Sequence, residues 1–447
     1  MPDRPHVVYL HAHDMGRFNS AYGFGVRSPA MQRIAEEGVV YRKAYSAAPT
    51  CSPSRAALLT GLPANMTGML GLAHRGWSLT HPERCLPQAF ADAGYRTVRA
   101  GLQHVRHWNE KTTGVGYSDE QPATSQRGAA VGEHAGTLIR EHFEQGDPTP
   151  LFLDVGSVDA HLPYTHGTDV EDDPRYLQPP APLPDTPKVR ADLAAYATLV
   201  NRFDQTVAAV YQALADAGVL DETILVVTTD HGLALPGMKC NCNDNGLGVT
   251  LLVRGPRFEK GVADDQLRSH LDLYPTLVDA CGIDRPEHLQ LAPPDLRGMS
   301  LHDDVGDRVL FGEVTYHAAY EPVRAIRTAS HSFVRRFDPR VRTTMPNIDD
   351  SGVRDALTAV GLDRRRDAEV ALHDLMFDPQ EVCNLADDGA HDELRRSMSG
   401  QLHALMVAMD DPLLSGAVAP PQGGMVSMHW AATIEEGDAT IGPETHD

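Results

Sequence analysis

The sequence predicts an α/β protein with a mostly parallel central sheet, followed by a smaller α+β domain with an antiparallel sheet. Over the first two thirds of the chain, short apolar runs alternate with longer runs of helical periodicity, as in parallel sheets covered by helices. In the last third, consecutive strand-like runs precede one amphipathic helix. We therefore expect a first domain over residues 1–321, a second over 322–412 and an irregular tail over 413–447.

Glycines and apolar runs indicate where the individual helices and strands begin and end. Gly38, Gly94 and Gly218 follow helical runs and end them. The run 223–229 is almost continuously apolar, as in a strand covered on both faces. Strands are expected at 7–10, 96–100, 151–155, 223–229, 251–253, 323–328, 333–337 and 371–375. Helices are expected at 31–38, 86–93, 133–145, 193–217, 271–280 and 393–409.

The composition is that of a soluble globular protein. The 447 residues are 42% hydrophobic and 22% charged, too apolar for a disordered chain. The net charge of -22 argues against nucleic-acid binding, which needs basic surface. No apolar run reaches the roughly 20 residues of a membrane span, and the charged residues 1–5 lack the features of a signal peptide. With its 6 irregularly spaced cysteines, the chain is expected to be cytoplasmic, with no nucleic-acid or membrane partner.

Polar side chains gather where the predicted strands end. The strands end at His11-Ala12-His13-Asp14, Gln103-His104, Asp159-Ala160-His161 and Asp230-His231-Gly232. Ligands bind at the carboxyl ends of strands in open α/β sheets, so these side chains are expected to share one crevice. Asp14, Asp230 and His231 suit a hard or borderline divalent cation. The alternative for each residue alone is a structural role, such as a turn cap for Asp230.

The segment 49–61 is the strongest local signal. Pro53 fits a first helical turn and Gly61 a helix end, which places Cys51 at a helix N-terminus. Free amides and the helix dipole there favour an anion, either a thiolate or a bound sulfate or phosphate. Arg55 lies one turn further on. A structural cysteine at a helix start is the alternative.

This segment resembles the signature of the type I sulfatases. The matching residues are Cys51-Ser52-Pro53-Ser54-Arg55 and Leu59-Thr60-Gly61, with His104, His161-Leu162-Pro163, Thr229-Asp230-His231-Gly232, Lys239 and Leu372-His373-Asp374-Leu375 in the same order as in the family. The similarity covers most of residues 5–390 and is greatest to heparan N-sulfatase (sulfamidase)-like members. It implies an alkaline phosphatase-like fold and conversion of Cys51 to formylglycine by a maturation enzyme.

The resemblance also implies the site and its reaction. A divalent metal, Ca²⁺ in most of the family with Mn²⁺, Mg²⁺ and Zn²⁺ as alternatives, would be held by His13, Asp14, Cys51, Asp230 and His231. In a sulfatase, a hydrate of formylglycine attacks the sulfur of a small sulfate ester or sulfamate. Lys239 would stabilise the sulfate oxygens, His161 would protonate the leaving group, His104 would assist the hydrate, and Arg55 would position it.

Three positions depart from the family pattern. His13 replaces an aspartate, Leu102 replaces a lysine, and Val158 replaces an additional histidine of the sulfamidases. His13 and Leu102 leave a non-catalytic binding homologue open as an alternative. A phosphodiesterase or phosphonate monoester hydrolase is the other alternative, because such enzymes share this fold and type of nucleophile. Substrate specificity is expected in the loops 163–190, 237–248 and 315–323, with Glu313, His317 and Tyr320 as candidate pocket residues. The oligomeric state, including a homo-oligomer, stays open.

Overall fold

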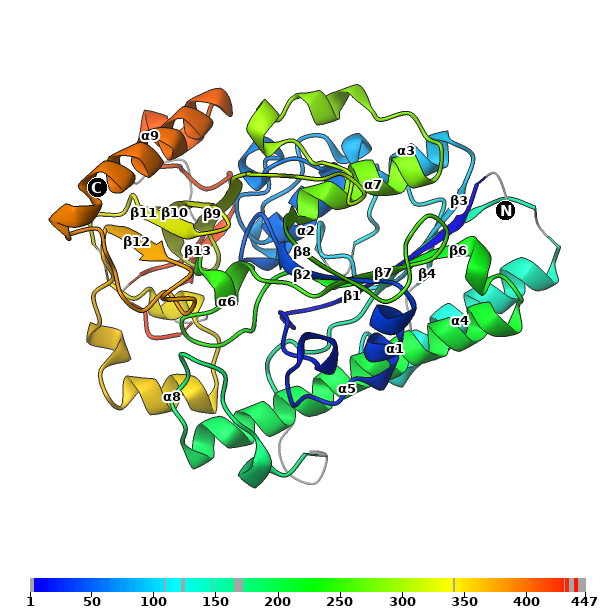
Figure 1. Cartoon of the computed structure of the whole chain (residues 1–447), viewed down its shortest axis with the longest axis horizontal. Helices are drawn as coiled ribbons and strands as arrows, with labels where there is room; N and C mark the ends of the chain where they lie inside the picture. The colour runs from blue at the N-terminus through cyan, green and yellow to red at the C-terminus, as the bar shows by residue number, and fades with distance from the viewer. Residues whose placement is uncertain are drawn as a thin grey trace.

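Two sheets with helices on both faces of the larger one make up the computed structural model (Figure 1). It describes residues 4–107, 110–121, 125–146, 148–164, 172–340, 342–429, 431–433 and 438–440. The larger sheet has the strand order β4-β3-β5-β1-β6-β7-β2-β8, and the smaller one the order β12-β11-β10-β9. The predicted fold class is therefore confirmed.

The central sheet is parallel except at β7. Its strands are β1 (His6–Ala12), β2 (Val39–Tyr45), β3 (Arg96–Gly101), β4 (Asp119–Gln121), β5 (Leu151–Gly156), β6 (Thr223–Thr229), β7 (Leu251–Arg254) and β8 (Val262–Ser269). Strand β1 lies in the middle and pairs in parallel with both β5 and β6, whereas β7 runs antiparallel to β6 and β2. The expected strands of the first two thirds are confirmed, and β2, β4 and β8 were not predicted.

Helices cover both faces of this sheet, as Figure 1 shows. The helices are α1 (Pro29–Glu37), α2 (Cys51–Thr60), α3 (Leu86–Asp92), α4 (Ala129–Glu144), α5 (Pro187–Asp216), α6 (Asp244–Leu247) and α7 (Leu273–Ala280). Val8 and Leu10 of β1 pack with α1, α4 and α5, while Val7 and Tyr9 pack with α2, α3 and α7. Each fully buried valine or leucine stabilises the fold by about 1.5–3 kcal/mol.

Helix α5 starts earlier than its apolar pattern predicts. Thr186 caps the helix by accepting from Val189 N–H, and Pro187 occupies the first turn. The first turn is partly exposed, so apolar periodicity begins only near Leu193, the residue at which the sequence places the start. The other expected helices are found within a few residues of their predicted ends.

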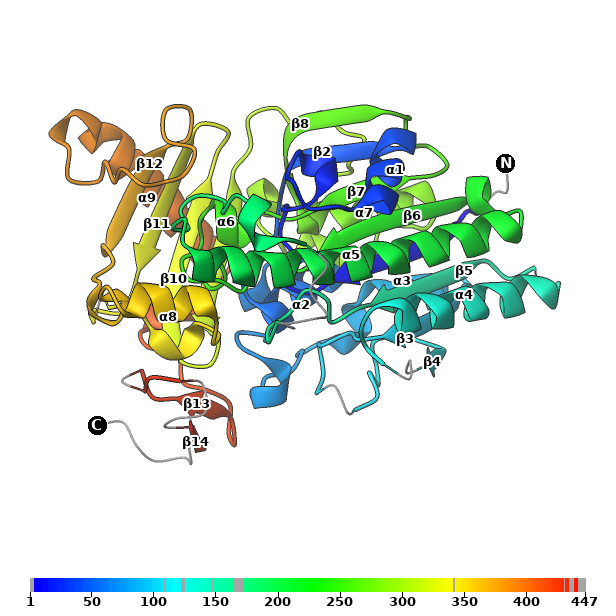
Figure 2. The same cartoon turned by 90° about the horizontal axis from the view of Figure 1, so that it is seen from below.

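The smaller sheet lies at the other end of the molecule from the N-terminus (Figure 2). It contains β9 (Leu310–Tyr316), β10 (Tyr320–Arg327), β11 (His331–Arg336) and β12 (Val370–Asp374), and α9 (Asp392–Ala408) packs on it, with α8 (Gly352–Thr358) nearer α5. Strand β9 precedes residue 322, so the sheet includes a strand on the first-domain side of the expected boundary. The division into domains stays a prediction.

The predicted tail holds a short hairpin, β13 (Met425–Ser427) with β14 (Asp438–Thr440). Arg75 donates to the carbonyl of Met425 at 3.1 Å and ties the tail to the main body. Residues 434–437 and 441–447 of this tail, and 165–171 of the proposed specificity loop, lie outside the described residues. Within the described chain, no helix has both the length and the apolar character that crossing a membrane requires.

A buried charged cluster joins the smaller sheet to the segment after α9. Arg324 on β10 donates to both carboxylate oxygens of Asp411, at 2.6 and 3.0 Å. Glu313 on β9 lies 3.7 Å from the same guanidinium and accepts from Asn65 N–H at 2.9 Å. Burial raises the pKa of Glu313 to about 7, although Arg324 opposes this shift. Glu313 is therefore held protonated over a pH range in which an exposed glutamate is ionised.

The raised pKa of Glu313 predicts a pH-dependent stability. As pH rises from about 4.5 towards 7, the unfolded chain loses this proton before the folded one, so stability falls. Glu313→Gln removes this pH dependence of stability, because glutamine does not titrate. In urea unfolding, the free energy of unfolding of the variant should equal that of the wild type at pH 4.5. At pH 8 it should be higher by on the order of 1–3 kcal/mol. The exposed Glu369→Gln is the control, and an equal difference at both pH values for Glu313→Gln would contradict the assignment.

Candidate functional site

Two carboxylates meet where strands β1 and β6 end. Asp14 follows β1 and Asp230 follows β6, and both are fully buried. Asp230 Oδ1 accepts hydrogen bonds from the backbone N–H groups of Asp14 and His231, each at 2.9 Å. Asp14 has a φ of +54°, a left-handed conformation that aspartate adopts more readily than most residues. Asp230 thereby fixes the chain after both strands.

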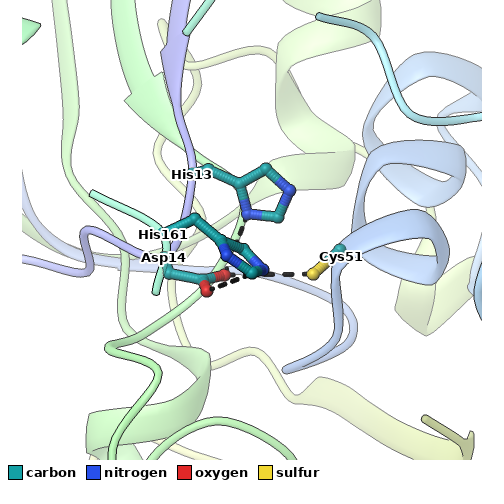
Figure 3. A group of neighbouring side chains, drawn as sticks. All are labelled: His13, Asp14, Cys51 and His161. Atoms are coloured by element: carbon teal, nitrogen blue, oxygen red, sulfur yellow. Dashed lines mark hydrogen bonds and ion pairs between the residues drawn. The ribbon is translucent and has the colours of Figure 1, made fainter. Parts of the chain in front are cut away.

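Imidazole and sulfur atoms surround these carboxylates, as Figure 3 shows for part of the site. His13 Nδ1 lies 3.0 Å from Asp14 Oδ1 and 3.1 Å from Asp230 Oδ2. His231 Nε2 lies 3.1 Å from Asp14 Oδ1. The potential ligands form two overlapping groups with donor atoms within 4.8 Å of one another: His13, Asp14, Cys51 and His161, and Asp14, Cys51, Asp230 and His231. The structure therefore brings together all the residues predicted to hold a metal.

Cys51 is the first residue of α2 and faces this cluster. Its Sγ lies 3.4 Å from His231 Nε2 and 3.9 Å from Asp14 Oδ1. Burial raises the pKa of the thiol well above its usual value, although Lys239 opposes this shift. An unmodified Cys51 is therefore a neutral thiol near pH 7, which is a poor nucleophile. Chemistry by a simple thiolate at this helix start is disfavoured.

Arg55 supports the cluster from the next turn of α2. Its Nη2 donates to Asp230 Oδ2 at 3.0 Å and to the carbonyl of Ala12 at 3.2 Å, while Nη1 lies 2.6 Å from His11 Nδ1. His11 in turn contacts Asp154 on β5 at 2.8 Å. The guanidinium thus connects the ends of β1 and β6 to α2, and all its partners are buried.

Lys239 lies between two carboxylates. Its Nζ is 3.1 Å from Asp14 Oδ2 and 2.9 Å from Asp349 Oδ2. Burial alone would lower the pKa of Lys239, but the two carboxylates raise it well above its usual value, so the ammonium stays charged. Asp349 comes from the segment before α8, which carries no motif or periodicity. Reasoning from sequence missed it for that reason.

A row of imidazoles borders the metal-binding cluster. His13 Nε2 lies 3.4 Å from His104 Nδ1, and His104 Nε2 lies 3.1 Å from His74 Nδ1. Burial lowers the pKa of His13 to about 3 and that of His74 to about 4, and it also lowers the pKa of His104. These rings are therefore neutral near pH 7. His104 was predicted, whereas His74 was missed because its segment carries no recognised pattern.

These side chains open onto a cavity of about 360 Å³. It is lined by His13, Cys51, Leu72, His74, Leu102, His104, Gln126, Val158, His161, Lys239, His317 and Asp349. His317, which the sequence analysis names as a candidate pocket residue, lines this cavity. Glu313 belongs instead to the buried cluster of the smaller sheet, and the Tyr320 hydroxyl accepts from Val418 N–H.

Comparison with known families identifies the chain. The family model described as Sulfatase matches residues 5–283. The chain belongs to the sulfatase family. Its members hydrolyse sulfuric esters, and the predicted enzyme class is confirmed.

Relatives of this sulfatase share most of its length. Human N-sulphoglucosamine sulphohydrolase is 29% identical, covering 92% of this chain and 91% of the relative. An ulvan-active sulfatase of Formosa agariphila is 26% identical, over 91% of this chain and 76% of the relative. A Bacteroides fragilis protein assigned as a sulfatase superposes with a TM-score of 0.74 at 18% identity, covering 94% of this chain and 99% of that protein. The sulfatase fold is thus confirmed along nearly the whole chain.

The residues of this sulfatase fit a divalent cation, which the family is known to use. Asp14 and Asp230 supply negative charge. Position 51 belongs with Asp14 to both groups of potential ligands, while His13 and His231 each belong to one of them. The departures from the family pattern all lie at this site. His13 is among the potential ligands, and Leu102 and Val158 line the cavity, where they add apolar surface in place of a lysine and a histidine.

The contacts of Arg55 predict a large structural effect of its removal. Arg55→Met leaves Asp230 buried without its guanidinium partner, which typically costs about 3–5 kcal/mol. Urea unfolding should show this loss. The control Arg33→Met, whose side chain is 59% exposed, should change stability by at most about 0.5 kcal/mol. Equal losses in the two variants would show that Arg55 does not hold the site together.

Proposed function

We propose that this sulfatase hydrolyses a small sulfate ester or sulfamate, using a formylglycine made from Cys51 and one divalent metal. The observation that carries the proposal is the position of Cys51 at the cavity, with its Sγ beside His231 Nε2 and Asp14 Oδ1. Position 51 is thus adjacent to a site that can hold a metal, at the start of a helix whose signature matches the family. A formylglycine-generating maturation enzyme is the partner that this proposal requires.

The metal and the formylglycine would have distinct roles. When bound by His13, Asp14, Asp230, His231 and the residue-51 oxygen, the metal would lower the pKa of the attacking hydroxyl and screen the sulfate charge. The hydrated aldehyde would supply one hydroxyl to attack sulfur and a second to release sulfate.

Lys239 and His161 supply the charge and the proton that the reaction needs. The Lys239 ammonium lines the cavity and would stabilise the non-bridging sulfate oxygens. His161 Nε2 is 3.6 Å from Asp14 Oδ2, and its side chain is 29% exposed towards the cavity, so it can protonate the leaving oxygen or nitrogen. His104, through its contact with His13, would assist the hydrate. Removing a single charge-stabilising contact of the Lys239 kind typically costs on the order of 10²–10³ in rate.

The cavity and the relatives support a small substrate. A volume of about 360 Å³ suits a monosaccharide-sized group. The human relative is named for N-sulphoglucosamine, and a fold neighbour with a TM-score of 0.68 was solved with its substrate D-glucosamine-2-N,6-O-disulfate. Asp349 and His317 face this cavity and are suited to bind hydroxyl or amine groups next to the sulfate.

A second candidate is hydrolysis of phosphonate monoesters or phosphodiesters. The observation that favours it is the Asp230-His231 pair directly after β6, because such enzymes share this fold and type of nucleophile and also carry Asp-His after the strand. A binding protein without turnover is the third candidate, and its expected property is an unmodified Cys51.

The proposed function predicts both a modification and a turnover. Protein co-produced with a formylglycine-generating enzyme should contain a residue-51 peptide lighter by roughly 18 Da, since an aldehyde replaces the thiol. It should release sulfate from 4-nitrophenyl sulfate or glucosamine N-sulfate, and Cys51→Ala should lower this rate by at least about 10³-fold. Mass spectrometry and sulfate release measure the two effects.

The control for Cys51→Ala is Cys383→Ala, which removes an exposed cysteine far along the chain. It should leave the rate unchanged. Faster hydrolysis of a phenylphosphonate monoester than of any sulfate would establish the second candidate. A thiol at position 51 without any turnover, in protein made with an active maturation enzyme, would establish the binding homologue.

A further inference from the structure

We infer that the metal site selects Zn²⁺ over Ca²⁺, the ion that the family resemblance implies. The inference rests on the proposed function only in that one divalent metal binds among His13, Asp14, Asp230, His231 and position 51. It depends on the chemistry of the donors, on their charge and on the oxygens that surround them.

Imidazole nitrogens belong to both groups of potential ligands. His13 and His161 lie with Asp14 and Cys51, and His231 lies with Asp14, Cys51 and Asp230. His13 stands where the family has an aspartate, and its Nδ1 lies 3.0 and 3.1 Å from the two carboxylates. Ca²⁺ prefers six to eight oxygen ligands, whereas imidazole suits zinc. Whichever group binds the ion, at least one of its four donors is an imidazole, which favours zinc.

The tautomer of His231 makes its Nε2 a potential metal ligand. Its Nδ1 lies 3.0 Å from the carbonyl oxygen of Gly232, which can only accept, so Nδ1 carries a proton. Nε2 then faces Asp14 Oδ1 at 3.1 Å and Cys51 Sγ at 3.4 Å. Two electron-rich atoms at such a distance repel each other unless a proton or a metal ion lies between them. Nε2 and Asp14 Oδ1 are therefore positioned to bind one metal ion together.

The charges already present weaken attraction for a hard ion. Arg55 neutralises Asp230 at 3.0 Å, and Lys239 neutralises Asp14 at 3.1 Å. Asp349 shares Lys239 at 2.9 Å, so three carboxylates and two cations leave only about one negative charge to hold Ca²⁺ by electrostatics. A nitrogen–metal bond depends less on net charge, because the neutral imidazole donates an electron pair.

The nearby backbone oxygens are already engaged. The Ala12 carbonyl accepts from Arg55, the Asp230 carbonyl from Ser54 Oγ at 2.5 Å, and the His231 carbonyl from Gly16 N–H at 2.9 Å. A calcium site would need several such oxygens to reach its usual coordination number. A four- to six-coordinate transition ion needs only the side chains present and water.

His104 and His74 hold the His13 ring in place. His13 Nε2 is 3.4 Å from His104 Nδ1, and His104 Nε2 is 3.1 Å from His74. Ligating histidines usually use their second nitrogen in such a contact, which fixes the orientation of the first. The arrangement therefore presents Nδ1 of His13 to the cluster as a ligand.

Direct metal binding tests this inference without reference to turnover. The full chain carrying Cys51→Ser is stripped of metal and titrated with ZnCl₂, MnCl₂ and CaCl₂ by calorimetry. Cys51→Ser is used because an unmodified thiol would itself favour zinc. We expect Zn²⁺ to bind at least about 100-fold more tightly than Ca²⁺, and Mn²⁺, which prefers oxygen ligands, to bind more weakly than Zn²⁺. A Ca²⁺ affinity equal to or above that of Zn²⁺ would overturn the inference.

His13→Asp in the same background should reduce the preference by at least about 10-fold, since it restores a carboxylate at this position. His403→Asp, an exposed change on α9 with the same charge difference, should leave the preference unchanged. An unchanged preference in a folded His13→Asp variant would overturn the role of His13. If that variant does not fold, X-ray absorption of the zinc-loaded Cys51→Ser protein should still show imidazole ligation, and zinc without an imidazole ligand would overturn the inference.

The outcomes also separate this inference from the proposed function. Sulfate release by a calcium-loaded mature enzyme that binds zinc no better would overturn the metal inference and leave the sulfatase proposal in place. Tight zinc binding by a mature protein without turnover would support the inference and contradict the proposal.

Discussion

The site depends on keeping two carboxylates buried side by side. Asp14 and Asp230 lie at the ends of adjacent parallel strands, and bringing their charges out of water is unfavourable unless cations accompany them. Arg55 compensates Asp230 and Lys239 compensates Asp14, and both have further partners that hold them there. Although burial opposes ionisation, the cations and imidazoles around them keep the pKa of both carboxylates below the usual value. The pair is thereby ionised and ready to bind a metal.

The same arrangement explains which residues the neighbouring elements contribute to the site. Helix α2 carries both Cys51 and Arg55, so the cysteine proposed for modification and the cation paired with Asp230 are positioned by one turn of helix. The segment before α8 brings in Asp349, which shares Lys239 with Asp14 and so links the connection between β11 and β12 to the cavity. The neutral rings of His13, His74 and His104 line part of the remaining wall. Lys239 supplies positive charge at the cavity, to which the proposed metal would add.

Much of the site could be predicted from the sequence, because its reactive side chains come directly after strands or lie at the start of one helix. Asp14, Asp230 and Cys51 occupy such positions, and their types and order match a family. Strand β2 was missed because its exposed Arg42 and Lys43 interrupt the apolar run, and β8 because it alternates with aspartates at a sheet edge. Asp349 and His74 act through long-range contacts of irregular segments, which no local pattern encodes.

A crystal structure of the mature protein, with anomalous diffraction recorded at the manganese and zinc edges, would test the central claim most directly. The account predicts one anomalous peak bonded to Asp14, Asp230, His13 and His231, and a hydrated aldehyde at residue 51 in contact with the same ion. A Cys51 thiol, or an ion bound by the carboxylates and water while both imidazoles stay unbonded, would contradict it.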